Sequence, residues 1–154
     1  MHFDTNFDQH RIEWHHIEEP IDENGFKVDY EYSILAYDLS FGRLDMMMRF
    51  NGNGGGCEPH SHLASTTLLI LEGEQRLKEL QPDGSIKEII RTKGDYALCP
   101  PDAAPHIESS GPEGCTLFLS LHAQNGGLFG VYDSLYNKLA DFTIEDFVAR
   151  WTAR

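Results

Sequence analysis

The sequence predicts an all-β protein built from antiparallel strands, followed by a C-terminal α-helical segment. About eight short apolar stretches recur at the roughly 8–12-residue spacing typical of a sandwich or barrel. Loop-forming residues separate them, above all in "NGNGGG" (51–56) and "QPDGS" (81–85). Only the C-terminal part of the chain changes to a helical period.

The strands can be placed in order along the chain. "FKVDYEYSILAYDLS" (26–40) and "RLDMMMRF" (43–50) flank Phe41-Gly42 and predict a hairpin. Two further runs follow and end at "QPDGS", where proline fixes φ and Asp-Gly allows a tight reversal. With "IKEII" and the apolar "CTLFLSL" (115–121), they complete a barrel core that we expect over residues 26–123.

The stretch "DSLYNKLADFTIEDFVARW" predicts a helical segment over residues 134–152. Leu135 and Leu139 are four residues apart, and Thr143 stands three residues before Asp146, as in an N-terminal cap. An i, i+3, i+4, i+7 stripe follows, formed by Ile144, Phe147, Val148 and Trp151. We expect this stripe to pack on the outside of the barrel or on a second subunit.

Length and composition limit the possible functions. The 154 residues suit one domain over 1–154, and the formal net charge of −13 argues against nucleic acid as a partner. No apolar run is long enough for a membrane span or a secretory signal, so a cytoplasmic location is expected. Cys57, Cys99 and Cys115 form no C-x-x-C pair, which argues against a disulfide framework or a zinc cage.

Three histidines stand out by their position. His60 and His62 are two apart on a predicted strand, so their side chains share a face. His106 follows "CPPDAAP", a proline-bounded turn, and strands this far apart in the chain can converge. Imidazole is the commonest ligand for divalent transition metals. Spacing alone leaves a metal site and a half-buried sheet with hydrogen-bonded histidines equally open.

The first of two motifs here resembles that of the cupin superfamily, G-x5-H-x-H-x3-E-x6-G. Gly54 is followed at the motif spacing by His60 and His62. Thr66 then stands at the glutamate position, and Gly73 closes the motif.

The second cupin motif, G-x5-P-x-G-x2-H-x3-N, is also recognisable. Gly94 and Pro100 match, 101–105 lead to His106, and Ser110 takes the asparagine position, with one residue more than the pattern. Both motifs in this order resemble an RmlC-like cupin. The resemblance implies an antiparallel double-stranded β-helix, the cupin jelly roll, with the helical segment added at its C-terminus.

The sequence departs from the two motifs at one metal ligand and at one glycine. The usual glutamate is replaced by Thr66, or by Thr67 if the spacing is four, and the glycine of the second motif by Asp102 or Ala103. All three histidines are present. The sequence therefore resembles the three-histidine dioxygenase cupins, of which acetylacetone dioxygenase, with its three-histidine iron centre, is one.

A fourth ligand is suggested by a second resemblance. Dihydroxyacetophenone dioxygenase and ChrR-type cupin domains have a run similar to "LEGEQRLKEL". In that dioxygenase a glutamate beyond the glycine binds the iron together with three histidines. Here Glu79 lies six residues after Gly73 and shares strand parity with Gln75 and the apolar Leu77. A metal ion would compensate the negative charge of a carboxylate buried there. Alternatively the strand ends before Pro82, and Glu79 reaches solvent.

The resemblance thus implies one divalent metal per chain, Fe(II) first, with Zn, Ni or Mn as alternatives. The proposed ligands are His60, His62, His106 and Glu79. Gln75 and Thr66 are candidates for substrate contact, because one shares the face of Glu79 and the other occupies a motif position.

The function implied by this resemblance is that of a non-haem Fe(II) dioxygenase acting on a small diketone or hydroxyketone. Two alternatives stay open: a non-catalytic cupin that binds a small molecule in regulation, and a metal-assisted isomerase or lyase. The negative charge favours an uncharged or weakly acidic substrate. A homodimer is expected, because this fold leaves sheet edges that need covering.

Overall fold

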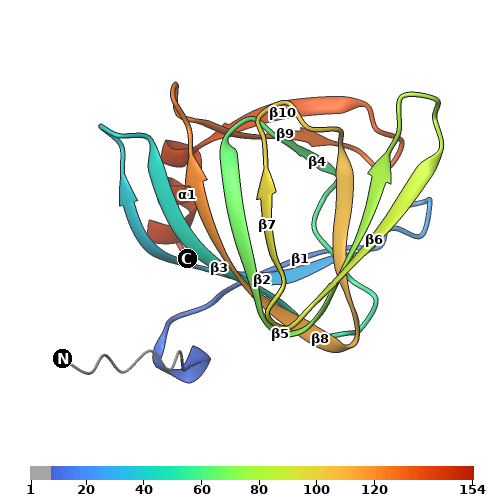
Figure 1. The fold of residues 1–154 in the computed structure, drawn as a ribbon, viewed down its shortest axis with the longest axis horizontal. Coiled ribbons are helices and arrows are strands. Elements are labelled where there is room, and N and C mark those ends of the chain that lie inside the picture. The colour runs from blue at the N-terminus through green and yellow to red at the C-terminus, as the bar shows by residue number, and fades with distance from the viewer. Residues whose placement is uncertain (1–7) are drawn as a thin grey trace.

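The strands curl into two facing layers of one antiparallel barrel in the computed structural model, which describes residues 8–154 (Figure 1). The strand order is β1-β2-β3-β8-β4-β9-β10, and β5 pairs with β6, β7 and β8. A short 3-10 helix (Gln9–Arg11) precedes the strands, and α1 (Ile144–Thr152) follows them. The strands are β1 (His15–Glu19), β2 (Val28–Asp38), β3 (Arg43–Phe50), β4 (His60–His62), β5 (Ser65–Leu80), β6 (Ile86–Thr92), β7 (Tyr96–Cys99), β8 (His106–His122), β9 (Gly127–Tyr132) and β10 (Lys138–Thr143).

The two longest strands, β5 and β8, belong to both layers. One half of each lies with β3 and β7, and the other half lies with β4 and β6. Register shifts on either side of Gly73 mark the corner of β5. Gly73 has a φ of 75°, and a Cβ there would lie 2.1 Å from the carbonyl oxygen of Gly114, so only glycine fits. This corner lets β8 run from the apolar core to the histidine cluster.

The core lies between the layers, where alternate side chains of the strands point inward. The expected hairpin over residues 26–50 is confirmed, since β2 and β3 pair with Tyr32 opposite Met48. Side chains that are fully buried between the layers include Tyr32, Leu44, Met46, Ile70, Leu117, Leu121 and Leu128.

The C-terminal helix is shorter than the predicted range 134–152. Helix α1 begins at Ile144, and the residues before it form β10 instead. The carboxylate of Asp133 accepts the backbone N–H groups of Leu135 and Asn137, which makes a turn into β10. Backbone pairing with β9 then takes the place of helical hydrogen bonds. Leu135 is 66% exposed, so the spacing that suggested a helix here buries no apolar stripe.

The remainder of the helix prediction is confirmed. The Thr143 hydroxyl accepts the backbone N–H of Asp146, and the Asp146 carboxylate accepts the backbone N–H of Thr143. The predicted stripe packs on the core through Ile144, Phe147, Val148 and Trp151.

β-structure also extends beyond the expected core of 26–123, because β1, β9 and β10 join the sheet. Within the described part of the chain, no helix is both long and apolar enough to cross a membrane.

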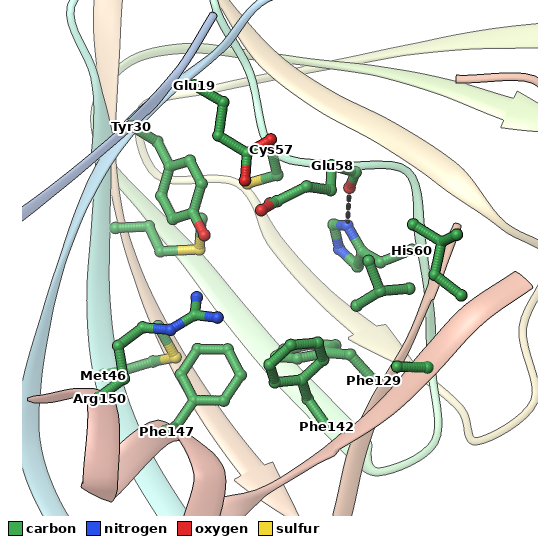
Figure 2. Close-up of a pocket in the computed structure, with 14 residues that line it drawn as sticks. Glu19, Tyr30, Met46, Cys57, Glu58, His60, Phe129, Phe142, Phe147 and Arg150 are labelled. Carbon is green, nitrogen blue, oxygen red and sulfur yellow. Dashed lines mark hydrogen bonds between the residues drawn. The ribbon is translucent and has the colours of Figure 1, made fainter. Parts of the chain in front are cut away.

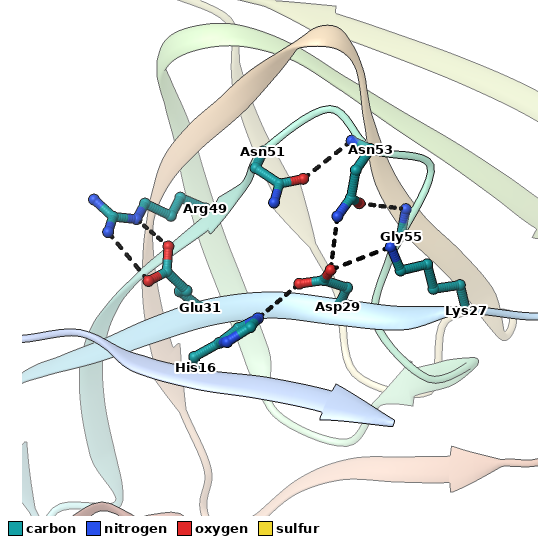
Figure 3. Close-up of polar contacts among 8 residues, drawn as sticks. All are labelled: His16, Lys27, Asp29, Glu31, Arg49, Asn51, Asn53 and Gly55. Carbon is teal, nitrogen blue, oxygen red and sulfur yellow. Dashed lines mark hydrogen bonds and ion pairs between the residues drawn. The ribbon is translucent and has the colours of Figure 1, made fainter. Parts of the chain in front are cut away.

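A buried carboxylate, that of Asp29, ties the glycine-rich loop 51–56 to β2 (Figure 3). One of its oxygens accepts a hydrogen bond from His16 Nε2 at 2.8 Å, and the other accepts one from Asn53 Nδ2 at 2.7 Å. The Lys27 ammonium adds an ion pair at 3.4 Å. Because this loop leads directly into β4, the network helps to position the histidine cluster.

The pair of His16 and Asp29 predicts a pH-dependent contribution to stability. The hydrogen bond to Asp29 raises the pKa of His16 above its usual 6.5. Burial acts to raise the pKa of Asp29, but its hydrogen bonds from His16 and Asn53 outweigh this and lower it below 3.8. The contribution of His16 is therefore fully present below pH 6.5 and is lost as the pH rises through its raised pKa.

We expect His16→Gln to lower the thermal midpoint at about pH 5.5 and to change it little at about pH 9, as measured by circular dichroism. An equal difference between the variant and the wild-type protein at both pH values would contradict this assignment.

Candidate metal centre

Strands β4 and β8 bring three histidines together. His60 and His62 lie on β4, and His60 pairs in register with His106 of β8. The ring centroids of His60 and His106 are 4.5 Å apart, and those of His62 and His106 are 5.1 Å apart. All three are buried, and each offers a ring nitrogen within 4.8 Å of the other two. The histidines of the two sequence motifs thus form one compact cluster.

Hydrogen bonds fix the tautomer of both β4 imidazoles. His60 Nδ1 lies 2.8 Å from the carbonyl oxygen of Glu58, which can only accept, so Nδ1 carries the proton. His62 Nδ1 lies 2.8 Å from the Thr66 hydroxyl, which itself donates to the Ala64 carbonyl oxygen at 3.2 Å and so accepts from the ring. In each neutral ring Nε2 therefore keeps its lone pair, the state a metal ligand needs.

Burial favours the uncharged form of the imidazoles of His62 and His106. It lowers the pKa of His62 to about 3, with a further contribution from the neighbouring His60. It also lowers the pKa of His106 well below 6.5. Both rings are therefore neutral at pH 7 and can act as ligands. This donor set fits a divalent transition metal, which His60, His62 and His106 would hold.

Thr66 and Gln75 form hydrogen bonds that position side chains in or near the cluster. Thr66, which stands where the cupin motif has its glutamate, is 0% exposed and orients His62. Gln75 is 1% exposed and bonds to Glu108 and Arg91. Neither residue is among those that line the cavity beside the cluster. Their contact with a substrate stays a prediction, and the role that the structure gives them is to position other side chains.

Glu79 is the strand partner of His106 but is not part of the histidine cluster. It pairs with His106 across the two strands, β5 and β8, and is half-buried. Its Oε1 accepts a hydrogen bond from Gln81 Nε2 at 3.1 Å. The group of ligand atoms within 4.8 Å of one another contains the three histidines without Glu79. Coordination by Glu79 stays a prediction.

Glu108 is a site residue that the sequence reasoning missed. It lies two residues after His106 on β8 and is 3% exposed. Its Oε2 lies 3.9 Å from His60 Nε2, and its Oε1 accepts a hydrogen bond from Gln75 Nε2 at 2.8 Å. Gln75 Oε1 in turn accepts one from Arg91 at 3.0 Å. Strand parity with His106 was the signal that could have identified Glu108.

The fold can be compared with solved structures, although no protein-family model matches this sequence and no curated protein matches it significantly. An RmlC-like cupin from Ralstonia eutropha aligns with a TM-score of 0.67 and 13% identity, over 95% of this chain and 83% of that one. A cupin-like protein from Thermotoga maritima aligns with a TM-score of 0.55 and 18% identity, over 83% and 89%. An acetylacetone dioxygenase from Acinetobacter johnsonii aligns with a TM-score of 0.63 and 12% identity, over 99% and 93%. The protein has the RmlC-like cupin fold.

The protein has a cavity of about 340 Å³ beside His60, between the barrel and α1 (Figure 2). The Phe129 ring separates part of it from the cluster, with its centroid 5.3 Å from those of both His60 and His62. Most of the other lining side chains are apolar or aromatic, among them Met46, Met48, Val131, Leu139, Phe142 and Phe147. The cavity therefore offers an apolar enclosure that reaches the histidine cluster at His60.

Four polar side chains also line this cavity, from Glu19, Tyr30, Glu58 and Arg150. In Figure 2 the Arg150 guanidinium points into the cavity, opposite the carboxylates of Glu19 and Glu58. Within residues 8–154, Arg150 forms no ion pair. Burial raises the pKa of Glu19, and the charge of Glu58 adds to this shift. Arg150 thus has hydrogen-bond donors available for a bound ligand.

The cluster predicts that metal binding needs each of the three imidazoles. Replacement of His60, His62 or His106 by alanine should each remove most of the metal that the wild-type protein binds, because a site with few ligands loses much of its affinity with any one of them. His122→Ala, at an exposed histidine, is the control. Elemental analysis of the purified proteins measures the effect. Stoichiometric metal in a variant that carries all three replacements would rule out this assignment.

Proposed function

We propose that this cupin is a mononuclear non-haem iron(II) dioxygenase that acts on a small diketone or hydroxyketone. The observation that carries the proposal is the buried cluster of three imidazoles, two of them with Nε2 left free by their hydrogen bonds, beside an apolar cavity. The likeness to an acetylacetone dioxygenase, which covers 99% of this chain, supports it at the level of the fold.

The donor set suits this chemistry because three protein ligands leave coordination positions open. Iron(II) held there would supply a Lewis acid for an enolate oxygen and a one-electron partner for O₂. The part of the protein is to hold the imidazoles of His60 and His62 in position, through the Glu58 carbonyl and the Thr66 hydroxyl.

The cavity suits a small substrate with an apolar body. Its volume, about 340 Å³, is near the lower end of the range of roughly 300–1,000 Å³ that ligand sites cover. Aromatic walls from Phe129, Phe142 and Phe147 would exclude water from the bound molecule. A ketone of a few carbon atoms would fit within this space.

Two side chains of the cavity would orient the oxygen atoms of that ketone. Burial raises the pKa of Tyr30 well above 10, so its hydroxyl stays protonated and can donate a hydrogen bond. The Arg150 guanidinium can donate charge-assisted hydrogen bonds to a carbonyl or enolate oxygen. Glu19 and Glu58, on the opposite side, would disfavour a substrate with more than one negative charge.

This role of Arg150 predicts a defect in substrate binding without a loss of metal. Arg150→Met should raise KM by about tenfold or more, since a hydrogen bond to a charged group contributes about 1.5–3 kcal/mol. Arg150→Lys, which keeps the charge, should lie between this variant and the wild type. Steady-state kinetics and metal analysis of all three proteins provide the test. An unchanged KM in Arg150→Met would show that this guanidinium does not contact the substrate.

The dioxygenase reaction itself predicts oxygen consumption that depends on iron. Protein loaded with Fe(II) under anaerobic conditions should consume one molecule of O₂ per molecule of substrate when mixed with acetylacetone or a panel of hydroxyketones. His106→Ala serves as the inactive control. If iron-loaded protein binds these ketones without oxygen uptake, the dioxygenase assignment is wrong, and a metal-assisted isomerase, a lyase or a binding protein takes its place.

A further inference from the structure

We infer that Glu108 is a fourth protein ligand of the metal site, held in place by Gln75 and Arg91. The inference rests on the metal site of the proposed function but not on the dioxygenase reaction. It places the carboxylate of the site on β8, two residues after His106, in a chain whose first motif has Thr66 at the glutamate position.

Two hydrogen bonds in series orient the Glu108 carboxylate. Arg91 has only donors, so the amide oxygen of Gln75 must face it, at 3.0 Å. The amide nitrogen of Gln75 then faces Glu108 and donates to its Oε1 at 2.8 Å. This leaves Oε2 as the carboxylate oxygen directed toward the histidine cluster, where it lies 3.9 Å from His60 Nε2.

The space between Glu108 Oε2 and His60 Nε2 suits a cation. His60 donates through Nδ1 to the Glu58 carbonyl, so in the neutral form of this ring Nε2 is an acceptor, as is the carboxylate oxygen of Glu108. Their separation of 3.9 Å is too long for a shared hydrogen bond. Two ligand atoms that are each about 2.0–2.2 Å from one ion lie about 3–4 Å apart, so a divalent cation would satisfy both.

The charge of a divalent ion also favours a carboxylate among its ligands. Both Glu108 and the three histidines are buried, so a divalent ion bound by imidazoles alone would keep its full charge in a region of low dielectric. The Glu108 carboxylate would offset half of that charge. Arg91 is connected to this carboxylate through the side chain of Gln75.

Glu79 is the competing candidate, and its surroundings are different. Its Oε1 is engaged by Gln81, and its side chain is half-buried, whereas Glu108 is 3% exposed. Glu108 itself lies outside the group of atoms that are all within 4.8 Å of one another. Its carboxyl group must therefore turn further toward His62 or His106 when the ion binds.

The two carboxylates provide a matched pair of variants, Glu108→Gln and Glu79→Gln. Each keeps the side-chain shape and removes the charge. Affinity for Zn(II), measured by competition with a chelator, should fall by about tenfold to hundredfold in Glu108→Gln and stay at the wild-type value in Glu79→Gln. The visible absorption of the Co(II)-loaded protein should change in Glu108→Gln alone, because it reports directly on the ligands of the ion.

The possible outcomes separate this inference from the proposed function. Wild-type affinity and an unchanged Co(II) spectrum in Glu108→Gln would overturn the inference and leave the dioxygenase proposal standing. A lower thermal midpoint of Glu108→Gln with an unchanged Co(II) spectrum would also overturn the inference, because Glu108 would then only stabilise the fold. Loss of affinity in Glu79→Gln instead would assign the ligand to Glu79. A wild-type protein that binds neither ion would overturn both proposals.

Discussion

The candidate site depends on the hydrogen bonds that hold the Nδ1 atoms of His60 and His62. Each bond fixes a tautomer, directs one ring and leaves Nε2 free, so the chemistry of the cluster is set by neighbouring oxygens of the same chain segment. Thr66 contributes through this geometry: at the position of the usual carboxylate, it orients a ligand. The corner at Gly73 and the pairing of β4 with β8 then bring His106 to the same point.

Much of this could be predicted from the sequence, because the information is local or lies in fixed spacings. Strand parity placed His60 and His62 on one face, and the two motifs connected them with His106. Glu108 was missed because the search for a carboxylate followed the run after Gly73 and reached Glu79. Its position depends on Gln75 and Arg91, which meet it only through the pairing of β5 with β6 and β8.

The C-terminal segment shows why the remainder was not predictable. Leu135 and Leu139 have helical spacing, yet both are 66% exposed in the fold. The free edge of β9 offers backbone partners to residues 138–143, and this tertiary pairing overrides a weak local preference. Where burial agrees with the local pattern, as at Ile144, the helix forms as expected.

The Nδ1 hydrogen bonds hold the imidazoles of β4 in the orientation and tautomer that a metal ligand needs. Long-range ¹H–¹⁵N correlation spectra of the histidine side chains, recorded before and after addition of Zn(II), test it most directly. We expect His60 and His62 to carry their proton on Nδ1 in the metal-free protein, and zinc to shift their Nε2 resonances. A proton on Nε2 of either ring, or Nε2 resonances that zinc leaves unchanged, would contradict it.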